Sequence, residues 1–195
     1  VDGATAIIVS AADTAADLVY VLPESNGTAQ SPINILTGAV RQADHEIALH
    51  YRPSREHVLN LGHTVEAEFE AGSTLEYDGE VYELRQLHFH TPAEHLIDGI
   101  TYPMEMHMVH TLRGTPDKYL VVGILFREGG DDAFVEEVLA HVPGRSGERF
   151  DGPMLLDAER ALGRIDGYYH YEGSLTTPPY SESVTWLVLK DVHQA

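Results

Sequence analysis

The chain has 195 residues, of which 43% are hydrophobic, and both values suit one folded domain with a buried core. It carries 31 acidic against 12 basic residues, and the formal net charge of −19 argues against binding to nucleic acid or to an anionic membrane. Cysteine is absent, which excludes disulfide bonds and thiolate zinc ligands, and no apolar run is long enough to span a membrane.

The first residues contain no cationic leader, so an intact signal peptide is not expected. A mature chain whose signal has been removed would begin in the same way, and we expect a secreted or periplasmic protein. The acidic, lysine-poor composition suits either an ordinary acidic protein or one adapted to a salty environment.

Polar and apolar residues alternate over several segments, which predicts a domain dominated by β-sheet. Residues 1–29 are weakly patterned and are expected to be irregular, whereas residues 30–195 are expected to form the single domain. Strands are predicted, in chain order, at 45–51, 63–70, 81–90, 104–111, 119–126, 168–171 and 184–189.

Turn and helix signals lie between these strands. Asp78-Gly79 predicts a tight turn before the strand at 81–90, and Asp131-Asp132 predicts the cap of a helix over 133–140. Phe134, Val138 and Leu139 would form the buried side of that helix, and a shorter helix is predicted at 153–162. We therefore expect a mainly β (α+β) fold: a large, twisted, mostly antiparallel mixed sheet with a few short peripheral helices.

Two of the predicted strands carry three histidines that together could bind one metal ion. Alternate side chains of a strand face the same side, so His88 and His90 share a face, and His107 comes from the strand at 104–111. Three histidines with a fourth position open to water are typical of a catalytic zinc rather than a structural one. The alternative is three surface histidines that happen to alternate.

The same alternation predicts hydrogen-bond partners for these imidazoles. On the strand at 81–90, the even positions would share one face: Tyr82, Leu84, Gln86, His88 and His90. On the strand at 104–111, Glu105 shares the face of His107 and the methionines face the other side. A zinc-bound imidazole usually donates its second N–H to an amide or carboxylate, so Gln86 and Glu105 are the predicted acceptors.

Several short segments, taken together, resemble the bacterial-type alpha-class carbonic anhydrases. They follow the family's order and are Gln30-Ser31-Pro32-Ile33, Asn60-Leu61-Gly62-His63, Gln86-Leu87-His88-Phe89-His90, Glu94-His95, Glu105-Met106-His107-Met108-Val109-His110, Gly173-Ser174-Leu175-Thr176-Thr177-Pro178-Pro179 and Trp186. The resemblance implies a zinc hydro-lyase that reversibly hydrates carbon dioxide to bicarbonate and a proton, through attack by a zinc-bound hydroxide.

The resemblance also implies roles for individual residues. Thr176 would orient the attacking hydroxide and pass its own proton toward Glu94, and His63 would carry protons to the solvent. His63 has the same parity as Val65 and Ala67, which we expect to face inward on the strand at 63–70. Without the flanking match, Thr176 would be a turn residue, Glu94 a solvated loop acid and His63 a bystander. The implied substrate pocket consists of Val109, Val121, Leu175, Thr177 and Trp186.

The implied partners are carbon dioxide and bicarbonate, with inhibition by sulfonamides and small anions, and a homodimer is possible. The resemblance fails at both ends: the family's aromatic N-terminal segment is not found upstream of Gln30, and the family continues well beyond residues 184–189. Two other functions remain open. One is a carbonic anhydrase-like binding module without catalysis, although such relatives typically lack one or more of the three histidines. The other is a zinc esterase, against which a narrow apolar pocket would argue.

Overall fold

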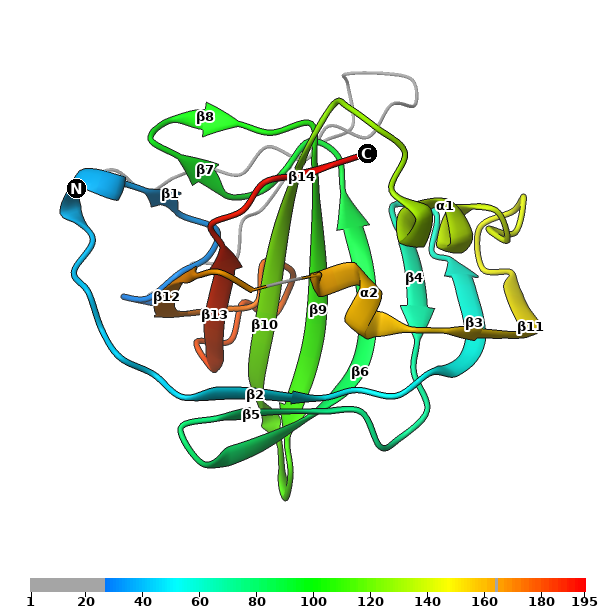
Figure 1. Ribbon diagram of the computed structural model, residues 1–195, viewed down its shortest axis with the longest axis horizontal. Coiled ribbons are helices and arrows are strands. Elements are labelled where there is room, and N and C mark those ends of the chain that lie inside the picture. The colour runs from blue at the N-terminus through cyan, green and yellow to red at the C-terminus, as the bar shows by residue number, and fades with distance from the viewer. Residues whose placement is uncertain (1–26, 164) are drawn as a thin grey trace.

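One large twisted sheet dominates the computed structural model, which describes residues 27–163 and 165–195 (Figure 1). Eleven strands of the described part form this sheet. Its main path runs in the order β11 (Arg149–Leu156), β3 (Ser54–Asn60), β4 (Val65–Glu68), β6 (Glu80–His90), β9 (Met104–Leu112), β10 (Thr115–Arg127), β13 (Val184–Leu189) and β12 (Tyr168–Gly173). Off this path, β14 (His193–Gln194) pairs with β10, while β5 (Thr74–Tyr77) joins β2 (Ile47–His50) to β6.

Most neighbouring strands of the sheet are antiparallel, but β13 and β14 both run parallel to β10. A second, three-stranded sheet consists of β1 (Asn34–Ile35), β7 (Leu96–Ile97) and β8 (Ile100–Thr101). A 3-10 helix at Thr37–Ala39 and two short α-helices, α1 (Ala133–Leu139) and α2 (Ala158–Leu162), complete the described elements. The predicted mainly β fold with a mixed, mostly antiparallel sheet is therefore confirmed.

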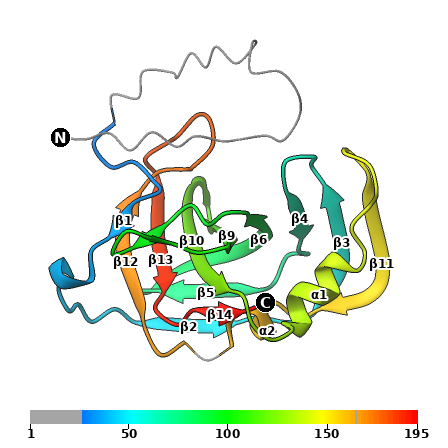
Figure 2. The ribbon, with the colours of Figure 1, turned by 90° about the horizontal axis from the view of Figure 1, so that it is seen from above.

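The two faces of the sheet carry two separate hydrophobic clusters, because alternate residues of a strand face opposite sides. In β10, Leu120, Val122 and Ile124 belong to the larger cluster, whereas Val121 and Leu125 belong to the smaller one. Both α-helices pack onto the larger cluster, and Figure 2 shows both helices on the same side of the sheet. The opposite face carries the smaller cluster and the three histidines.

Local signals in the sequence account for several elements. Asp132 accepts hydrogen bonds from the backbone N–H groups of Phe134 and Val135, which confirms the predicted helix cap. Asp78 and Gly79 both have positive φ, 48° and 80°, as the tight turn between β5 and β6 requires. No helix in residues 27–163 and 165–195 is long and apolar enough to cross a membrane.

Some predicted boundaries were wrong. Residues 149–156 form β11, so the helix predicted at 153–162 begins only at Ala158. On α1, Leu139 is 48% exposed, and Val135 is buried in its place. Residues 1–26 of the segment expected to be irregular lie outside the described residues, while residues 27–29 contain no helix or strand.

The predicted alternation was wrong for the first half of β6, because the strand contains a β-bulge. The register of β6 against β9 shifts between Leu84 and Gln86, so the strand changes parity at Arg85. Tyr82 and Leu84 therefore belong to the larger core cluster and do not share the face of Gln86, as the alternation had predicted. The histidine end of the strand keeps the predicted alternation, because Leu87 and Phe89 face the core on either side of His88.

The strand parity used for His63 does not place it on the face of the sheet that carries the three histidines. β4 begins at Val65, and His63 lies exposed in the bend before it. Val65 and Ala67 pack into the larger core cluster, on the side of the sheet opposite to the histidines. Parity with these residues therefore does not direct His63 toward the predicted metal site.

Candidate metal centre

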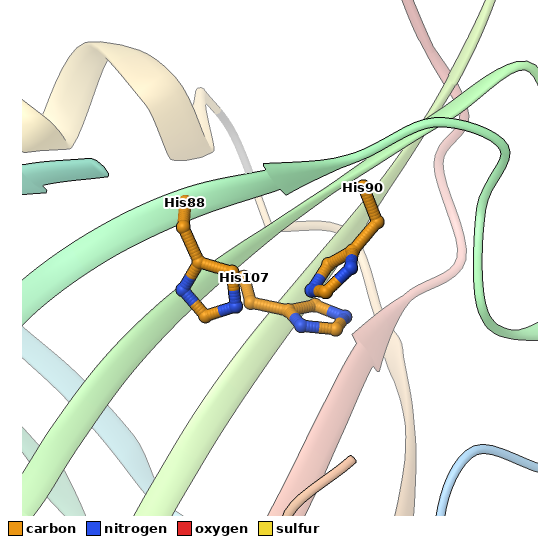
Figure 3. Close-up of side chains that lie close together, drawn as sticks. All are labelled: His88, His90 and His107. Carbon is orange, nitrogen blue, oxygen red and sulfur yellow. The ribbon is translucent and has the colours of Figure 1, made fainter. Parts of the chain in front are cut away.

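Three imidazoles converge on the face of the sheet opposite to the larger core. His88 and His90 come from β6, and His107 lies directly opposite His88 on β9. Their ring centroids are 4.9 Å apart for His88 and His90, 5.3 Å for His88 and His107, and 4.5 Å for His90 and His107. One ring nitrogen from each residue lies within 4.8 Å of the other two, and Figure 3 shows the three rings pointing toward a common space.

Hydrogen bonds of two of the rings determine which ring nitrogen is free to bind a metal. Nδ1 of His88 donates to Oε1 of Gln86 over 2.8 Å, and Nε2 of His107 donates to Oε1 of Glu105 over 2.8 Å. These are the two acceptors that the sequence predicted. Because both oxygens only accept, the second nitrogen of each ring, Nε2 of His88 and Nδ1 of His107, is left with a lone pair.

The remaining nitrogen is supplied by His90. Its Nε2 is buried and has no hydrogen-bond partner among the described residues. A buried polar atom without a partner is unfavourable unless a ligand satisfies it. Three imidazole nitrogens in this arrangement therefore suit one transition-metal ion, and the donor set is one that zinc accepts.

Burial sets the charge of two of the rings. Burial lowers the pKa of His88 to about 2, and the imidazoles of His107 and His90 act in the same direction. Burial likewise lowers the pKa of His90 to about 3, again with His107 acting in the same direction. Both rings are neutral at pH 7, and the neutral imidazole is the form that binds a metal.

His107 differs because a carboxylate lies against it. Burial acts to lower its pKa, but the charge and the hydrogen bond of Glu105 outweigh burial, so the pKa of His107 is raised. Glu105 is itself fully buried, and the two imidazoles of His107 and His95 hold its pKa well below the usual value in spite of burial. An ionised Glu105 thus strengthens His107 as an electron-pair donor.

Glu94 places a second carboxylate close to the ring nitrogens. Its Oε2 lies 3.6 Å from Nε2 of His90 and 3.9 Å from Nδ1 of His107. Burial raises the pKa of Glu94, while the charge of His107 and a hydrogen bond with the side chain of Thr176 act to lower it. The structure therefore brings Glu94 and Thr176 together beside the three histidines.

An apolar wall adjoins the imidazoles. Val121 and Trp186 are buried in the smaller cluster, with Val109 and Leu175 packed against it. The indole of Trp186 lies 4.8 Å from the ring of His107, and its Nε1 donates to the carbonyl of Ser174 over 3.1 Å. Thr177 is exposed in the following turn, where its carbonyl accepts the N–H of Tyr180.

A family model described as eukaryotic-type carbonic anhydrase matches residues 19–195. The chain belongs to this carbonic anhydrase family. It is 39% identical over 168 residues to a carbonic anhydrase of Neisseria gonorrhoeae, covering 85% of this chain and 65% of that protein. It is 36% identical over 178 residues to alpha carbonic anhydrase 7 of Arabidopsis thaliana, covering 85% of this chain and 62% of that protein.

Solved structures of carbonic anhydrases share the fold. The alpha-carbonic anhydrase from Thermovibrio ammonificans, in complex with the inhibitor sulfanilamide, superposes with a TM-score of 0.81 at 34% identity. That match covers 85% of this chain and 73% of the solved chain. The present chain spans slightly less than two thirds of the length of the two curated relatives above.

His63 lies within electrostatic range of the candidate metal centre, although strand parity does not direct it there. Its charge acts to lower the pKa of His88 and that of Glu66, so the imidazole lies within electrostatic range of both. Glu66 and His88 are directly opposed in the β4–β6 pair. His63 therefore occupies the solvent-exposed edge of the site, beside the start of β4.

A buried network behind Glu105 was not predicted from the sequence. Oε1 of Glu105 accepts from Nδ1 of His95 over 2.7 Å, and its Oε2 accepts the backbone N–H groups of Glu94 and His95 over 2.9 and 2.8 Å. Nε2 of His95 lies 2.6 Å from the hydroxyl of Tyr171, which donates to Oγ of Ser31 over 2.9 Å. Burial raises the pKa of Tyr171. The network ties the Glu94 loop to the His107 acceptor.

Proposed function

We propose that this chain is a zinc-dependent carbonic anhydrase that catalyses the reversible hydration of carbon dioxide to bicarbonate and a proton. The observation that carries the proposal is the convergence of three imidazole nitrogens. Two belong to rings whose other nitrogen donates to Gln86 or Glu105, and the third, in His90, is buried without a hydrogen-bond partner among the described residues. Membership of the carbonic anhydrase family supports the same reaction.

His88, His90 and His107 would hold the zinc ion, and Gln86 and Glu105 would fix the orientation of two of the rings. When bound, zinc supplies a Lewis acid that makes a water molecule nucleophilic near neutral pH, a principle for which carbonic anhydrase itself is the standard example. The protein must supply neutral ligands, and the low pKa values of His88 and His90 meet this requirement.

Thr176 and Glu94 would orient the nucleophile. A carboxylate accepts hydrogen bonds only, so an ionised Glu94 forces the hydroxyl hydrogen of Thr176 toward itself. The oxygen of Thr176 is then left with lone pairs that accept a hydrogen bond from the attacking water. Groups that are already in place before the reaction stabilise the transition state without having to reorganise when it forms.

The apolar wall would bind the substrate and His63 would remove the proton. Carbon dioxide is small and carries no net charge, and the packed side chains of Val121, Trp186 and Leu175 offer it an apolar surface. His63 is exposed at the edge of the site, and an imidazole exchanges protons near neutral pH. We also propose that the chain binds sulfonamides, because the solved Thermovibrio relative is a complex with sulfanilamide.

The test combines zinc analysis with stopped-flow measurement of carbon dioxide hydration. We expect one equivalent of zinc per chain, activity that disappears on chelation and returns on adding zinc, and inhibition by sulfanilamide. In the His107→Ala variant, zinc content and hydration should both fall. Full zinc content in that variant would contradict the ligand set, and a zinc-loaded parent without hydration activity would point instead to a binding module with this fold.

A further inference from the structure

One carboxylate that the proposed mechanism does not use faces the metal centre. In the antiparallel pair of β4 and β6, Glu66 is directly opposite His88. Directly opposed residues of such a pair project from the same face of the sheet, with Cβ atoms about 5 Å apart. The next pair, Ala67 and Leu87, lies in the larger core cluster on the other face, which fixes the direction of Glu66.

Glu66 differs from its neighbour Glu68 in its surroundings. Its neighbour on the same face, Glu68, forms an ion pair with Arg149 over 2.6 Å, but Glu66 forms no ion pair among the described residues. Burial and the charge of Glu68 raise the pKa of Glu66, whereas the charge of His63 acts to lower it. Glu66 is half-buried, so water screens its charge only in part.

We propose that Glu66 is a specificity-determining residue that weakens the binding of small anions at the metal centre, while leaving the approach of uncharged carbon dioxide unopposed. This inference rests on the proposed function. A negative charge beside the ligand set repels any anion that reaches the open side of the metal, the product bicarbonate included. Carbon dioxide has no net charge and experiences no such repulsion.

The expected size of the effect follows from the distance. We take about 8 Å as the separation between the Glu66 carboxylate and an anion held at the metal, because opposed Cβ atoms are about 5 Å apart and both side chains extend from the same face. At an effective dielectric constant between about 20 at a protein surface and about 80 in water, removing one charge at that distance strengthens anion binding by a factor between about 2 and about 30. The effect should shrink as salt screens the charge.

The experiment measures anion affinity directly on the holoenzyme with cobalt(II) in place of zinc. Thiocyanate is titrated at low ionic strength and at about pH 8, where a glutamate is ionised, and binding is followed by the visible absorption of the cobalt. The variants are Glu66→Gln, Glu66→Asp and Glu76→Gln. Glu76 is the matched control, because it is a half-buried carboxylate on β5, which pairs with the first residues of β6 and not with the histidine end.

We expect Glu66→Gln to bind thiocyanate between about 2-fold and about 30-fold more tightly than the parent, with the difference lost at high salt. Glu66→Asp, which keeps the charge, and Glu76→Gln should match the parent. Equal thiocyanate affinity of Glu66→Gln and Glu76→Gln would overturn the inference. The proposed function is tested separately, because it fails only if the zinc-loaded parent does not hydrate carbon dioxide.

Discussion

Replacing Glu105 by Gln tests whether its negative charge, rather than its shape, prepares His107 for the metal. Four N–H groups donate to this carboxylate: two backbone groups and the side chains of His95 and His107. A carboxamide keeps one acceptor oxygen and turns an NH2 group toward the remaining donors. The backbone N–H groups cannot move, so the two imidazoles must give way.

The consequence for His107 is specific. With an NH2 group in front of it, Nε2 of His107 has to accept, and the proton moves to Nδ1, the nitrogen that lies 3.9 Å from Oε2 of Glu94 and would bind the metal. A protonated nitrogen cannot bind zinc. Loss of such a hydrogen-bond partner typically weakens metal binding about 10- to 100-fold, and each buried donor left unpaired costs about 1–3 kcal/mol of stability.

The assay is competition for zinc against a chelating dye, together with urea unfolding of the metal-free proteins. The matched control is Glu56→Gln, which alters another fully buried carboxylate that accepts from a histidine, His141 Nδ1 over 2.6 Å. This control should lower the free energy of unfolding while leaving zinc affinity unchanged. If Glu105→Gln bound zinc within twofold of the parent, the tautomer argument would be refuted.

Three further outcomes are expected. Thr176→Ala should keep its zinc but lose about 3 kcal/mol of transition-state stabilisation, measured as kcat/KM for carbon dioxide; an unchanged value would remove Thr176 from the mechanism. His63→Ala should lower kcat in dilute buffer with little change in kcat/KM, and imidazole buffer should restore the rate, whereas equal turnover at low buffer would make His63 a bystander. Burial lowers the pKa of His110 to about 4, so between about pH 6.5 and 4 the unfolded chain binds a proton that the folded chain does not. The neutral, buried His110 therefore contributes fully to the free energy of unfolding above this window. The contribution decreases as the pH falls through the window, and at about pH 5 it is about 2 kcal/mol smaller than at about pH 7. In urea unfolding without metal, the free energy of unfolding of His110→Gln should therefore fall by about 2 kcal/mol less than that of the parent between about pH 7 and about pH 5.

The sequence predicted the histidine end of the sheet because the relevant information is local. His88, His90 and Gln86 lie within five residues of one strand, and His107 and Glu105 within three residues of another. Strict alternation is enough to bring such residues to one face. Alternation failed where the backbone added a residue to the ladder: the bulge at Arg85 moved Tyr82 and Leu84 to the core, and a bulge has no distinct hydrophobic pattern.

The network behind Glu105 could not be found by the same reasoning, because its members come from distant parts of the chain. Ser31 and Tyr171 are 140 positions apart, and Tyr171 and His95 are separated by 76. Only the parallel and antiparallel pairing of β10 with β13, and of β13 with β12, brings Tyr171 beside the Glu94 loop. A period of two predicts which face a residue occupies, but not which distant strand lies next to it. The residues that hold the imidazoles were therefore predictable, whereas the residues that hold their acceptor required the sheet order.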